Sequence, residues 1–335
     1  MAQTFNPDNV TVLQKKDGSI PLNNATELTA EVLNSSIVTQ LGKYEEMDGL
    51  RKEFTQLTDG GGAYWVNETQ KIATAKAKMV NFTMEAKKLG VIIPVSNEYL
   101  EFGLTDFFAK LQPYIVQKFN RKFDEAVILG KNNPFKQSIA RSIANAGTNI
   151  TGDLNKNAVF DIENKLYENG QDIQAFISTN RNITALRQAS LSKTEEIDTG
   201  FFKRESAIMG QLDGLPIVNM QSSLFPKGTL LGGNFDHLHY GIPKQMTYQL
   251  LDEAQLSTLT NEDGSPINLA EQDMKALRVT MYVATLITKD EAFAGLAAPN
   301  DDNVFATMPG TDSVDSTDPD SVANTVKAKA KATTK

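Results

Sequence analysis

The sequence lacks cysteine altogether and has two histidines and one tryptophan among its 335 residues. Without cysteine, the chain has no disulfide, no thiolate metal site and no cysteine nucleophile, which favours synthesis in a reducing cell. It also lacks any run approaching the roughly 18 apolar residues that a membrane span needs. The first residues, MAQTFNPDNV, show no basic stretch followed by an apolar one. We therefore expect neither secretion nor a membrane partner.

Positive charge is in deficit, with 33 Lys and Arg against 41 Asp and Glu and a formal net charge of -8. Dedicated nucleic-acid-binding proteins gain much of their affinity from Lys and Arg that neutralise phosphates. Basic residues gather only near the C-terminus, at Lys327, Lys329, Lys331 and Lys335. We expect no tight or sequence-specific binding of nucleic acid.

No catalytic motif is recognisable. His237 and His239, in FDHLHYG, would share one face of a strand and could bind a metal with Asp236, but no third close ligand is evident. We expect no catalytic residue, no cofactor-binding residue, no cofactor and no metal site, so the chain is not interpreted as an enzyme. A metal-dependent enzyme using the two histidines stays as an alternative.

Adjacent carboxylates are frequent in the sequence. Neighbours on a strand or helix point in different directions, so they rarely cooperate in acid and base catalysis. We interpret these pairs as solvated charges: Glu45-Glu46, Asp124-Glu125 and Asp252-Glu253.

The stretch TDGGGAYWVNETQKIATAKAKM, residues 58–79, predicts a long hairpin. No Gly-Lys-Ser/Thr follows Gly60, Gly61 and Gly62, which excludes a phosphate-binding loop. Strand-like residues 50–57 precede the glycines, and residues 80–86 alternate apolar and polar side chains with the period of a strand. The outer half, mainly Thr, Ala, Lys and Gln, cannot build a core. A lone hairpin is marginal in water, so this one must be mobile or lie on another molecule.

Candidate interface residues lie at the root and along the hairpin. Gly60, Gly61 and Gly62 would give a flexible root, and Tyr64 and Trp65 would anchor it on apolar surface. The lysines along the hairpin have three interpretations: salt bridges to a neighbouring subunit, a covalent isopeptide link to an Asn, or solubility of an exposed tip. These lysines are Lys71, Lys76 and Lys78.

A run that looks buried, LGVIIPV at 89–95, precedes the clearest helix of the chain. Apolar residues recur at three- and four-residue spacing from Phe108 to Val127, Thr105 and Asp106 can cap the start, and Gly130 ends the helix. Pro113 predicts a kink or a boundary after a short first turn.

The remaining segments predict a mixed α/β region between long strands. Residues 153–170 and 181–190 predict helices, 174–179 a buried strand, and Asp213-Gly214 a turn. Strands resume at 246–250 and 277–283, and Asn268 with Glu271 suggests a capping box for a short helix. Before and after these parts, 1–45 form a polar arm with one short helix after Thr26, and residues past 298 form a tail that we expect to be disordered.

In this order, the elements resemble the major capsid proteins of tailed bacteriophages, the Hong Kong 97 fold. Local segments spanning Phe5 to about Arg278 are similar to those of siphoviruses that infect Gram-positive hosts. These segments are FNPDNV, GAYWV, QKI, LGVIIPV, KFDEA, NNPF, LDGLPIV, YGIP and EQDMKALR.

The resemblance implies an α+β fold of named parts. Residues 1–45 would be the N-terminal arm, and 58–85 the extended loop that lies across a neighbouring subunit. The peripheral domain would comprise 46–57, 86–132 and 243–297, with a spine helix at about 105–130. Residues 133–242 would be an inserted α/β axial domain, and 298–335 the disordered tail.

It also implies a function: self-assembly as pentamers and hexamers into an icosahedral shell around double-stranded DNA. The partners would be a scaffolding protein during assembly and a portal protein at one vertex. Only a short arm precedes the fold, so we expect a separate scaffolding protein or a start near a processed end. The location would be the virion, assembled in the host bacterial cytoplasm. The alternatives are a cellular compartment shell of the same fold, or another phage structural element such as a tail-tube or minor capsid protein.

Overall fold

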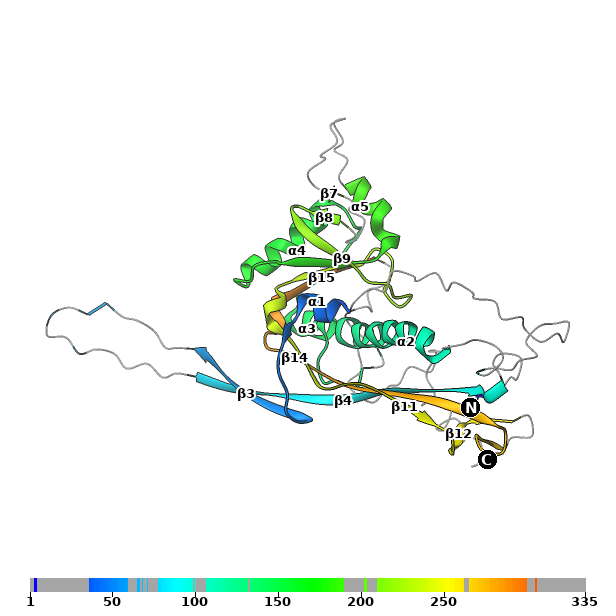
Figure 1. The fold of residues 1–335 in the computed structure, drawn as a ribbon. Helices are drawn as coiled ribbons and strands as arrows, with labels where there is room; N and C mark the ends of the chain where they lie inside the picture. Colours follow the sequence, from blue (N-terminus) through cyan, green and yellow to red (C-terminus); the bar gives the residue numbers. More distant parts are fainter. Residues whose placement is uncertain are drawn as a thin grey trace, which may run out of the picture.

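The computed structural model of the chain describes residues 3–4, 36–59, 65–66, 68, 71, 78–98, 100, 107–131, 133–189, 202–203, 210–261, 265–299 and 305. Long strands and a long helix form the lower body of the molecule, and a smaller α/β part lies above them (Figure 1). The short helix that the sequence predicts after Thr26 and the caps Thr105 and Asp106 lie outside the described residues.

A five-stranded sheet forms the base of the molecule. Its neighbouring strands are antiparallel, except that β2 and β11 run parallel. The strands that alternation predicts near 80–86, 246–250 and 277–283 are confirmed as parts of this sheet. In spatial order the strands are β2 (Lys43–Tyr44), β11 (Leu238–Leu251), β14 (Met274–Ile287), β4 (Lys78–Ser96) and β3 (Arg51–Asp59).

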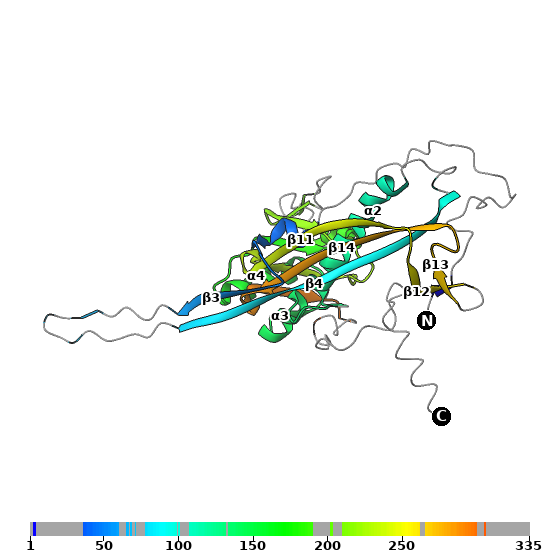
Figure 2. The ribbon, with the colours of Figure 1, turned by 60° about the horizontal axis from the view of Figure 1, so that its bottom comes forward.

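β3 and β4 form the base of the predicted hairpin. Their register runs from Arg51 opposite Glu85 to Asp59 opposite Lys78, and the paired strands project beyond the helices (Figure 1). β4 has 19 residues in all. Past the end of its pairing with β3 it continues without interruption and pairs with β14 from Ala86 to Ser96 (Figure 2). Within the described residues, no strand pairs with the other edge of β4 beyond Glu85. Pro94, which has no N–H to donate, is tolerated in this edge strand.

The expectation that LGVIIPV is buried is wrong. Val91 and Ile92 are 38% and 42% exposed, and only Val95 of this run is fully buried. The physical reason is the edge position of β4, because an edge strand has a neighbour on one side only. An apolar run in sequence does not distinguish an edge strand from a central one.

The long helix is confirmed as α2 (Phe107–Asp124), which continues into a π-helix, η3 (Glu125–Leu129). Gly130 ends it in the left-handed conformation with φ 68°, which glycine adopts without strain. Pro113 lies inside α2 and marks no boundary. Ile115 and Phe119 pack on β14 of the base sheet.

A seven-stranded mixed sheet lies above the base sheet and confirms the predicted α/β region. All four residues of β6 and of β10 are buried, and Asp213 and Gly214 form the predicted turn with φ 49° and 79°. The order is β5 (Asn149–Thr151), β15 (Phe293–Ala297), β10 (Leu230–Gly233), β6 (Ala175–Ser178), β9 (Leu215–Asn219), β8 (Gly210–Leu212) and β7 (Phe202–Lys203). The helical segments of this part are α3 (Ile139–Ala146), α4 (Lys156–Glu168), η4 (Asn180–Asn182), α5 (Ile183–Ala189), η5 (Phe235–His237) and η6 (Asp290–Ala292).

β15 differs from the sequence prediction, which assigned 243–297 to the sheet of long strands. β15 pairs with β10 and β5 in the upper sheet instead. The chain therefore crosses between the two sheets three times: after β4 into the upper sheet, after β10 back to the base sheet, and after β14 into the upper sheet again. These crossings bring the two sheets onto one core that contains Val127, Ile128 and Phe293.

Two segments that flank the sheets in sequence, α1 and Phe305, also join this core. In α1 (Ile37–Leu41), Ile37 and Val38 are buried there, although the sequence places them in an arm. Phe305 is 2% exposed and packs in the same core, although the expected disordered tail starts at 298. Residues 300–304 and 306–335 of that tail lie outside the described residues.

A three-stranded sheet, β1 (Gln3–Thr4), β12 (Gln255–Thr260) and β13 (Pro266–Asn268), lies at the far end of the base sheet (Figure 2). The short helix predicted from Asn268 and Glu271 does not form. Asn268 ends a strand that pairs with Gln255, and residues 269–273 are turns. Strand pairing thus replaces the predicted helix start.

Candidate functional site

The hairpin of β3 and β4 exposes apolar side chains where it leaves the body. Phe54 and Phe82 lie opposite each other and pack on the base of the hairpin. Farther out, Met79 is 67% exposed and Trp65 is fully exposed. The apolar surface of these two side chains is therefore not buried within the single subunit.

The other predicted interface residues are only partly described. Lys71 is exposed, and the backbone of Lys78 pairs with Asp59, so both lie on the hairpin as expected. No ion pair is recorded for Lys71 among the described residues. The remaining predicted residues, Gly60, Gly61, Gly62, Tyr64 and Lys76, lie outside the described residues.

Asp124, the last residue of α2, fastens α1 to the long helix. Its carboxylate accepts hydrogen bonds from the Ser36 hydroxyl (2.5 Å) and from the backbone N–H groups of Ile37 (3.0 Å) and Val38 (3.1 Å). First-turn N–H groups have no partner within a helix, so the carboxylate satisfies them. Burial raises the pKa of Asp124 to about 6, while the three hydrogen bonds act in the opposite direction.

Glu125, the next residue, joins α2 to the upper sheet. Its Oε1 accepts hydrogen bonds from Arg121 Nε (3.1 Å) and from the Ser222 hydroxyl (2.5 Å), which follows β9. Glu125 and Asp124 are 4% and 7% exposed. The prediction that this pair is solvated is therefore wrong: each carboxylate links a different segment of the chain to the long helix.

A pocket of about 350 Å³ lies between α2 and the segment that contains Asn219 and Ser222. Gln117 and Asn120 supply amide groups to its lining, and Asp124 supplies the one carboxyl group. That carboxyl group already accepts hydrogen bonds from α1, and among the described lining residues no second carboxyl group and no histidine accompanies it.

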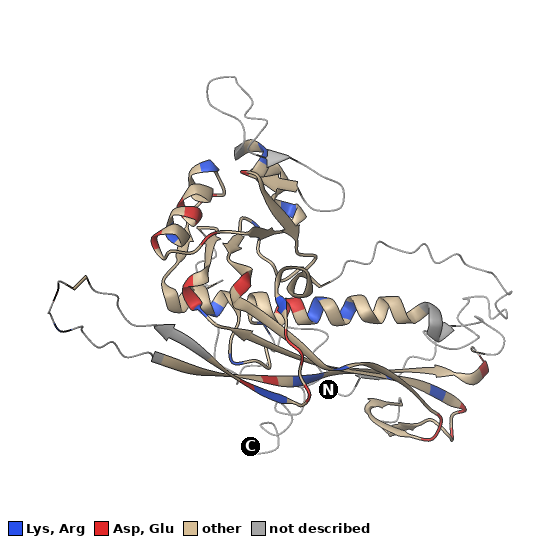
Figure 3. Ribbon diagram, turned by 60° about the vertical axis from the view of Figure 1, so that its left-hand side comes forward, with Lys and Arg blue, Asp and Glu red and all other residues tan. Residues whose placement is uncertain are grey.

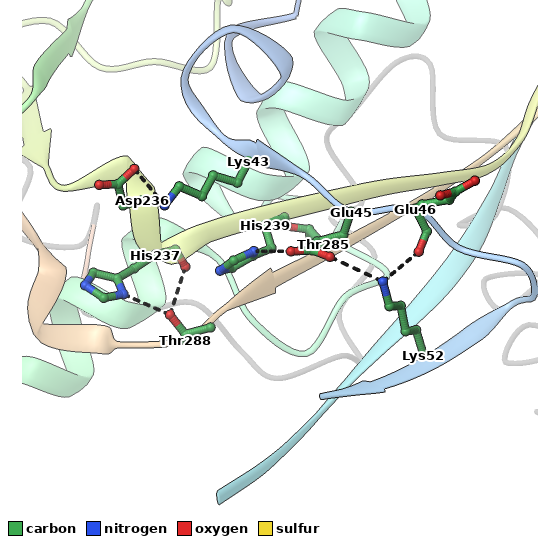
Figure 4. Close-up of polar contacts among 9 residues, drawn as sticks. All are labelled: Lys43, Glu45, Glu46, Lys52, Asp236, His237, His239, Thr285 and Thr288. Atoms are coloured by element: carbon green, nitrogen blue, oxygen red, sulfur yellow. Dashed lines mark hydrogen bonds and ion pairs between the residues drawn. The ribbon is translucent and has the colours of Figure 1, made fainter. Parts of the chain in front are cut away.

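The two histidines, which the sequence leaves open as an alternative metal site, lie in different elements and contact different neighbours. His237 ends η5 and lies 3.0 Å from Thr288 Oγ1, whereas His239 lies on β11 with its Nδ1 3.2 Å from Glu45 Oε1 (Figure 4). Burial is the main cause that lowers the pKa of His237, and the charge of nearby Lys289 lowers it further. In the part of the chain that the structure describes, no three His, Asp or Glu side chains gather as metal ligands.

These contacts instead hold the residues of β2 and the turn after it on the base sheet (Figure 4). Lys43 pairs with Asp236 at 3.1 Å, and Lys52 bridges Glu45 Oε2 at 3.2 Å and the Glu46 carbonyl at 2.7 Å. Hydrogen bonding to Lys43 is the first cause that lowers the pKa of Asp236. The exposed ion pairs among them stabilise little individually, and their role is to fix the path of the chain.

One half-buried carboxyl group among the described residues has a buried oxygen without a hydrogen-bond partner. Oε1 of Glu163, on α4, makes no hydrogen bond, and burial followed by the charge of Asp213 raises the pKa of this carboxyl group. A carboxylate pair without a third group or a neighbouring nucleophile does not form a catalytic set.

None of the described helices is long and apolar enough to cross a membrane.

The sequence analysis missed the anchoring of α1 by Asp124. The available signal was position: Asp124 and Glu125 fall inside the apolar pattern of the helix, between Phe123 and Ala126, which both face the core. Polar residues inside a core-facing pattern are usually hydrogen-bonded. Nothing in the sequence indicates that the partner of Asp124 is Ser36.

A body with two sheets on one core, a long helix, and a hairpin with an exposed tryptophan defines a structural subunit that works through contacts. The fold is that of tailed-phage capsid proteins, the Hong Kong 97 fold, as predicted. A solved structure from Microbacterium phage Oxtober96 aligns with a TM-score of 0.68 at 19% identity, covering 83% of this chain and 96% of that chain.

Sequence comparison identifies the family. Residues 19–297 match the phage capsid family. The chain is 48% identical over 295 residues to the major capsid protein of Staphylococcus phage 80alpha, covering 88% of this chain and 89% of the relative. It is 20% identical over 293 residues to a probable major capsid protein of Mycobacterium phage L5, covering 84% and 89%. The chain belongs to the phage capsid family, and it is a capsid protein of the virion.

Proposed function

We propose that the chain is the major head subunit, which assembles as pentamers and hexamers into an icosahedral shell around double-stranded DNA. The observation that carries the proposal is the projecting hairpin, whose Met79 and Trp65 are exposed in the single subunit. Burial of such side chains against a neighbouring copy is favourable, at about 25 cal/mol per Å² of apolar surface. The hairpin thus gains its packing from the next subunit.

The proposed parts follow those named in the sequence analysis. The hairpin residues 58–85 act as the extended loop, α2 with η3 as the spine helix, and residues 133–242 with β15 as the axial domain at the five-fold and six-fold axes. Gly60, Gly61, Gly62, Tyr64, Trp65, Lys71, Lys76 and Lys78 are the proposed interface residues. Their contacts are non-covalent in this proposal.

The proposed partners are a scaffolding protein during assembly and a portal protein at one vertex, with assembly in the host bacterial cytoplasm. The net charge of -8 supports a wall that does not retain packaged DNA. We propose no catalytic role, because neither the pocket beside α2 nor the histidines form a reactive set.

Negative-stain electron microscopy of the protein, expressed alone and with its candidate scaffolding protein, tests the proposal. We expect closed icosahedral shells, or rings of five and six subunits, in at least one sample. Dispersed monomers in both samples would contradict the proposal of a self-assembling head subunit.

A further inference from the structure

The base sheet buries one face and leaves part of the other uncovered. Leu277 and Val279 of β14 are buried under α2. Successive side chains of a strand point to opposite faces. Arg278, between them, therefore points away from α2, and it is exposed.

Three neighbouring rows of residues, which we name the open face, form this uncovered surface. Met47 covers the sheet on the hairpin side, where it packs on Ala284, and the β12 and β13 strands cover Ala276 on the far side. Between these covers, all nine residues are exposed or partly exposed. Across the strands β11, β14 and β4 the rows are Lys244, Tyr282 and Lys88; Thr247, Thr280 and Gly90; and Gln249, Arg278 and Ile92.

The open face carries positive charge and no negative charge. Lys88 and Lys244 flank Tyr282 on the two outer strands, about 10 Å apart given two strand spacings of about 4.8 Å. Arg278 hydrogen-bonds Gln249 on the same face. Within the described residues none of these three basic side chains forms an ion pair. In a chain with net charge -8, such a surface is complementary in charge to an anionic partner.

An opposite charge gathers at the far end of the same sheet, in a group that we name the acidic tip. Three turns meet there: Asn97 N donates to Asp273 O (3.0 Å), and Leu269 N donates to Ala254 O (3.0 Å). Figure 3 shows acidic residues at this end of the sheet. The acidic tip comprises five exposed residues, Glu98, Asp252, Glu253, Glu271 and Asp273, and the turns that carry them contain no Lys or Arg.

The acidic tip and the open face of one copy cannot meet. Both are fixed on the same strands, with Arg278 five residues from Asp273, or about 17 Å along β14 at 3.3 Å per residue. The β12 and β13 strands cover the sheet between them. No ion pair joins the two groups among the described residues.

We propose that the acidic tip of one subunit docks on the open face of a second copy of this chain. The inference rests on self-assembly into a shell, which places many copies side by side. A second copy fits better than nucleic acid, because three basic residues in a chain of net charge -8 are few for a phosphate backbone. The chain itself supplies the matching carboxylates.

The contact should be sensitive to salt and should act mainly on specificity. One exposed ion pair adds little stability, but the contact recurs at each copy, and complementary charges suppress wrong arrangements. Physiological salt screens exposed charges beyond about 8 Å. Assembly should therefore fall as ionic strength rises.

Charge reversal in the full chain, expressed with its scaffolding protein, tests the contact. One variant combines Lys88→Glu, Lys244→Glu and Arg278→Glu. A second combines Asp252→Lys, Glu253→Lys and Glu271→Lys, and a third carries both sets. The control reverses three exposed basic residues elsewhere, Arg181→Glu, Lys227→Glu and Lys289→Glu. Particle yield is counted by electron microscopy and sedimentation, and circular dichroism verifies that each subunit is folded.

We expect each single set to lower particle yield about tenfold, equivalent to roughly 1.4 kcal/mol, and the combined set to recover most of the yield. The unchanged chain must form particles in parallel, so that a failure of the proposed function is distinguished from a failure of this contact. Any of three outcomes would overturn the proposal. These are a normal yield in the first variant, a loss in the control as large as that in the first variant, and no recovery of yield in the third variant. Normal yield of particles that bind added double-stranded DNA less strongly than the unchanged particles do would also overturn it, since the open face would then bind the nucleic acid.

Discussion

The upper α/β part and the hairpin of the same chain differ in where their packing partners lie. In the upper sheet, every residue of β6 and β10 is buried by other residues of the same subunit. In the hairpin, Met79 and Trp65 face outward. The first region gains its stability within the subunit, whereas under the proposed function the second gains its packing from a neighbouring subunit. Mutations should therefore separate the two: core changes should unfold the subunit, and hairpin changes should alter the shell alone.

The largest effect on the subunit is expected for Phe176→Ala in β6. Phe176 is fully buried, and truncation of a buried Phe costs about 3 to 5 kcal/mol. Denaturant unfolding of the unassembled subunit measures this loss. Tyr167→Ala, at an exposed site on α4, is the matched control, with an expected change within about 0.5 kcal/mol. Equal losses in the two variants would remove the distinction between buried and exposed positions.

Phe305→Ala should have a similar or slightly smaller effect, about 3 kcal/mol. The Phe305 ring packs so closely on β15 that a methyl group at Gly295 would come within 2.6 Å of it. Truncation after Pro309 keeps this ring and serves as the control, with little expected change in melting temperature. A shortened chain as unstable as the Phe305→Ala variant would show that residues past 309 also stabilise the core.

A pH-dependent effect is expected at Asp124. Its folded pKa of about 6 exceeds the ordinary value of 3.8, so the folded state binds the proton more tightly. The stability from this group is full below about pH 4 and is lost as pH rises through about 6, by on the order of 2 to 3 kcal/mol. Asp124→Asn should flatten this fall in urea unfolding between pH 4 and 7. Asp161→Asn, exposed on α4, should retain it, and an unchanged slope in Asp124→Asn would refute the assignment.

The smallest effect on the subunit is expected for Trp65→Ala. The side chain is fully exposed, so the free energy of unfolding should change by less than about 0.5 kcal/mol. Particle yield and the heat stability of particles should nevertheless fall, because the side chain would lose its burial against a neighbour. Particles that form and melt normally would exclude Trp65 from the interface.

Much of the fold could be predicted because its signals are local. Apolar spacing and Gly130 locate the long helix, and a strand-like segment before the glycines together with alternation after them locates the hairpin. The failures concern partners distant in sequence. The Ser36 hydroxyl that binds Asp124 is 88 residues away, and the edge position of Val91 and Ile92 depends on where β3 begins, at Arg51 opposite Glu85. Asn268 pairs with Gln255 in a strand instead of starting a helix. A local capping pattern does not reveal this pairing.

The site was predictable to the same extent. Residue types predict that the hairpin is a contact surface, since it contains too little apolar surface for a core of its own. The histidine pair was uninformative, because His237 and His239 fall in different elements and hold different neighbours. The charges of the open face depend on the register of three strands, and no spacing in one strand reveals that register.

The uninterrupted course of β4 has a mechanical consequence. This strand starts in the hairpin, and from Ala86 to Ser96 it stays in continuous register with β14. Tension on the hairpin would load the hydrogen bonds of this ladder in shear, so that many must yield together rather than one by one. β4 is thus a stiff element. A force applied at its hairpin end would displace the turns beyond Ser96 at its other end.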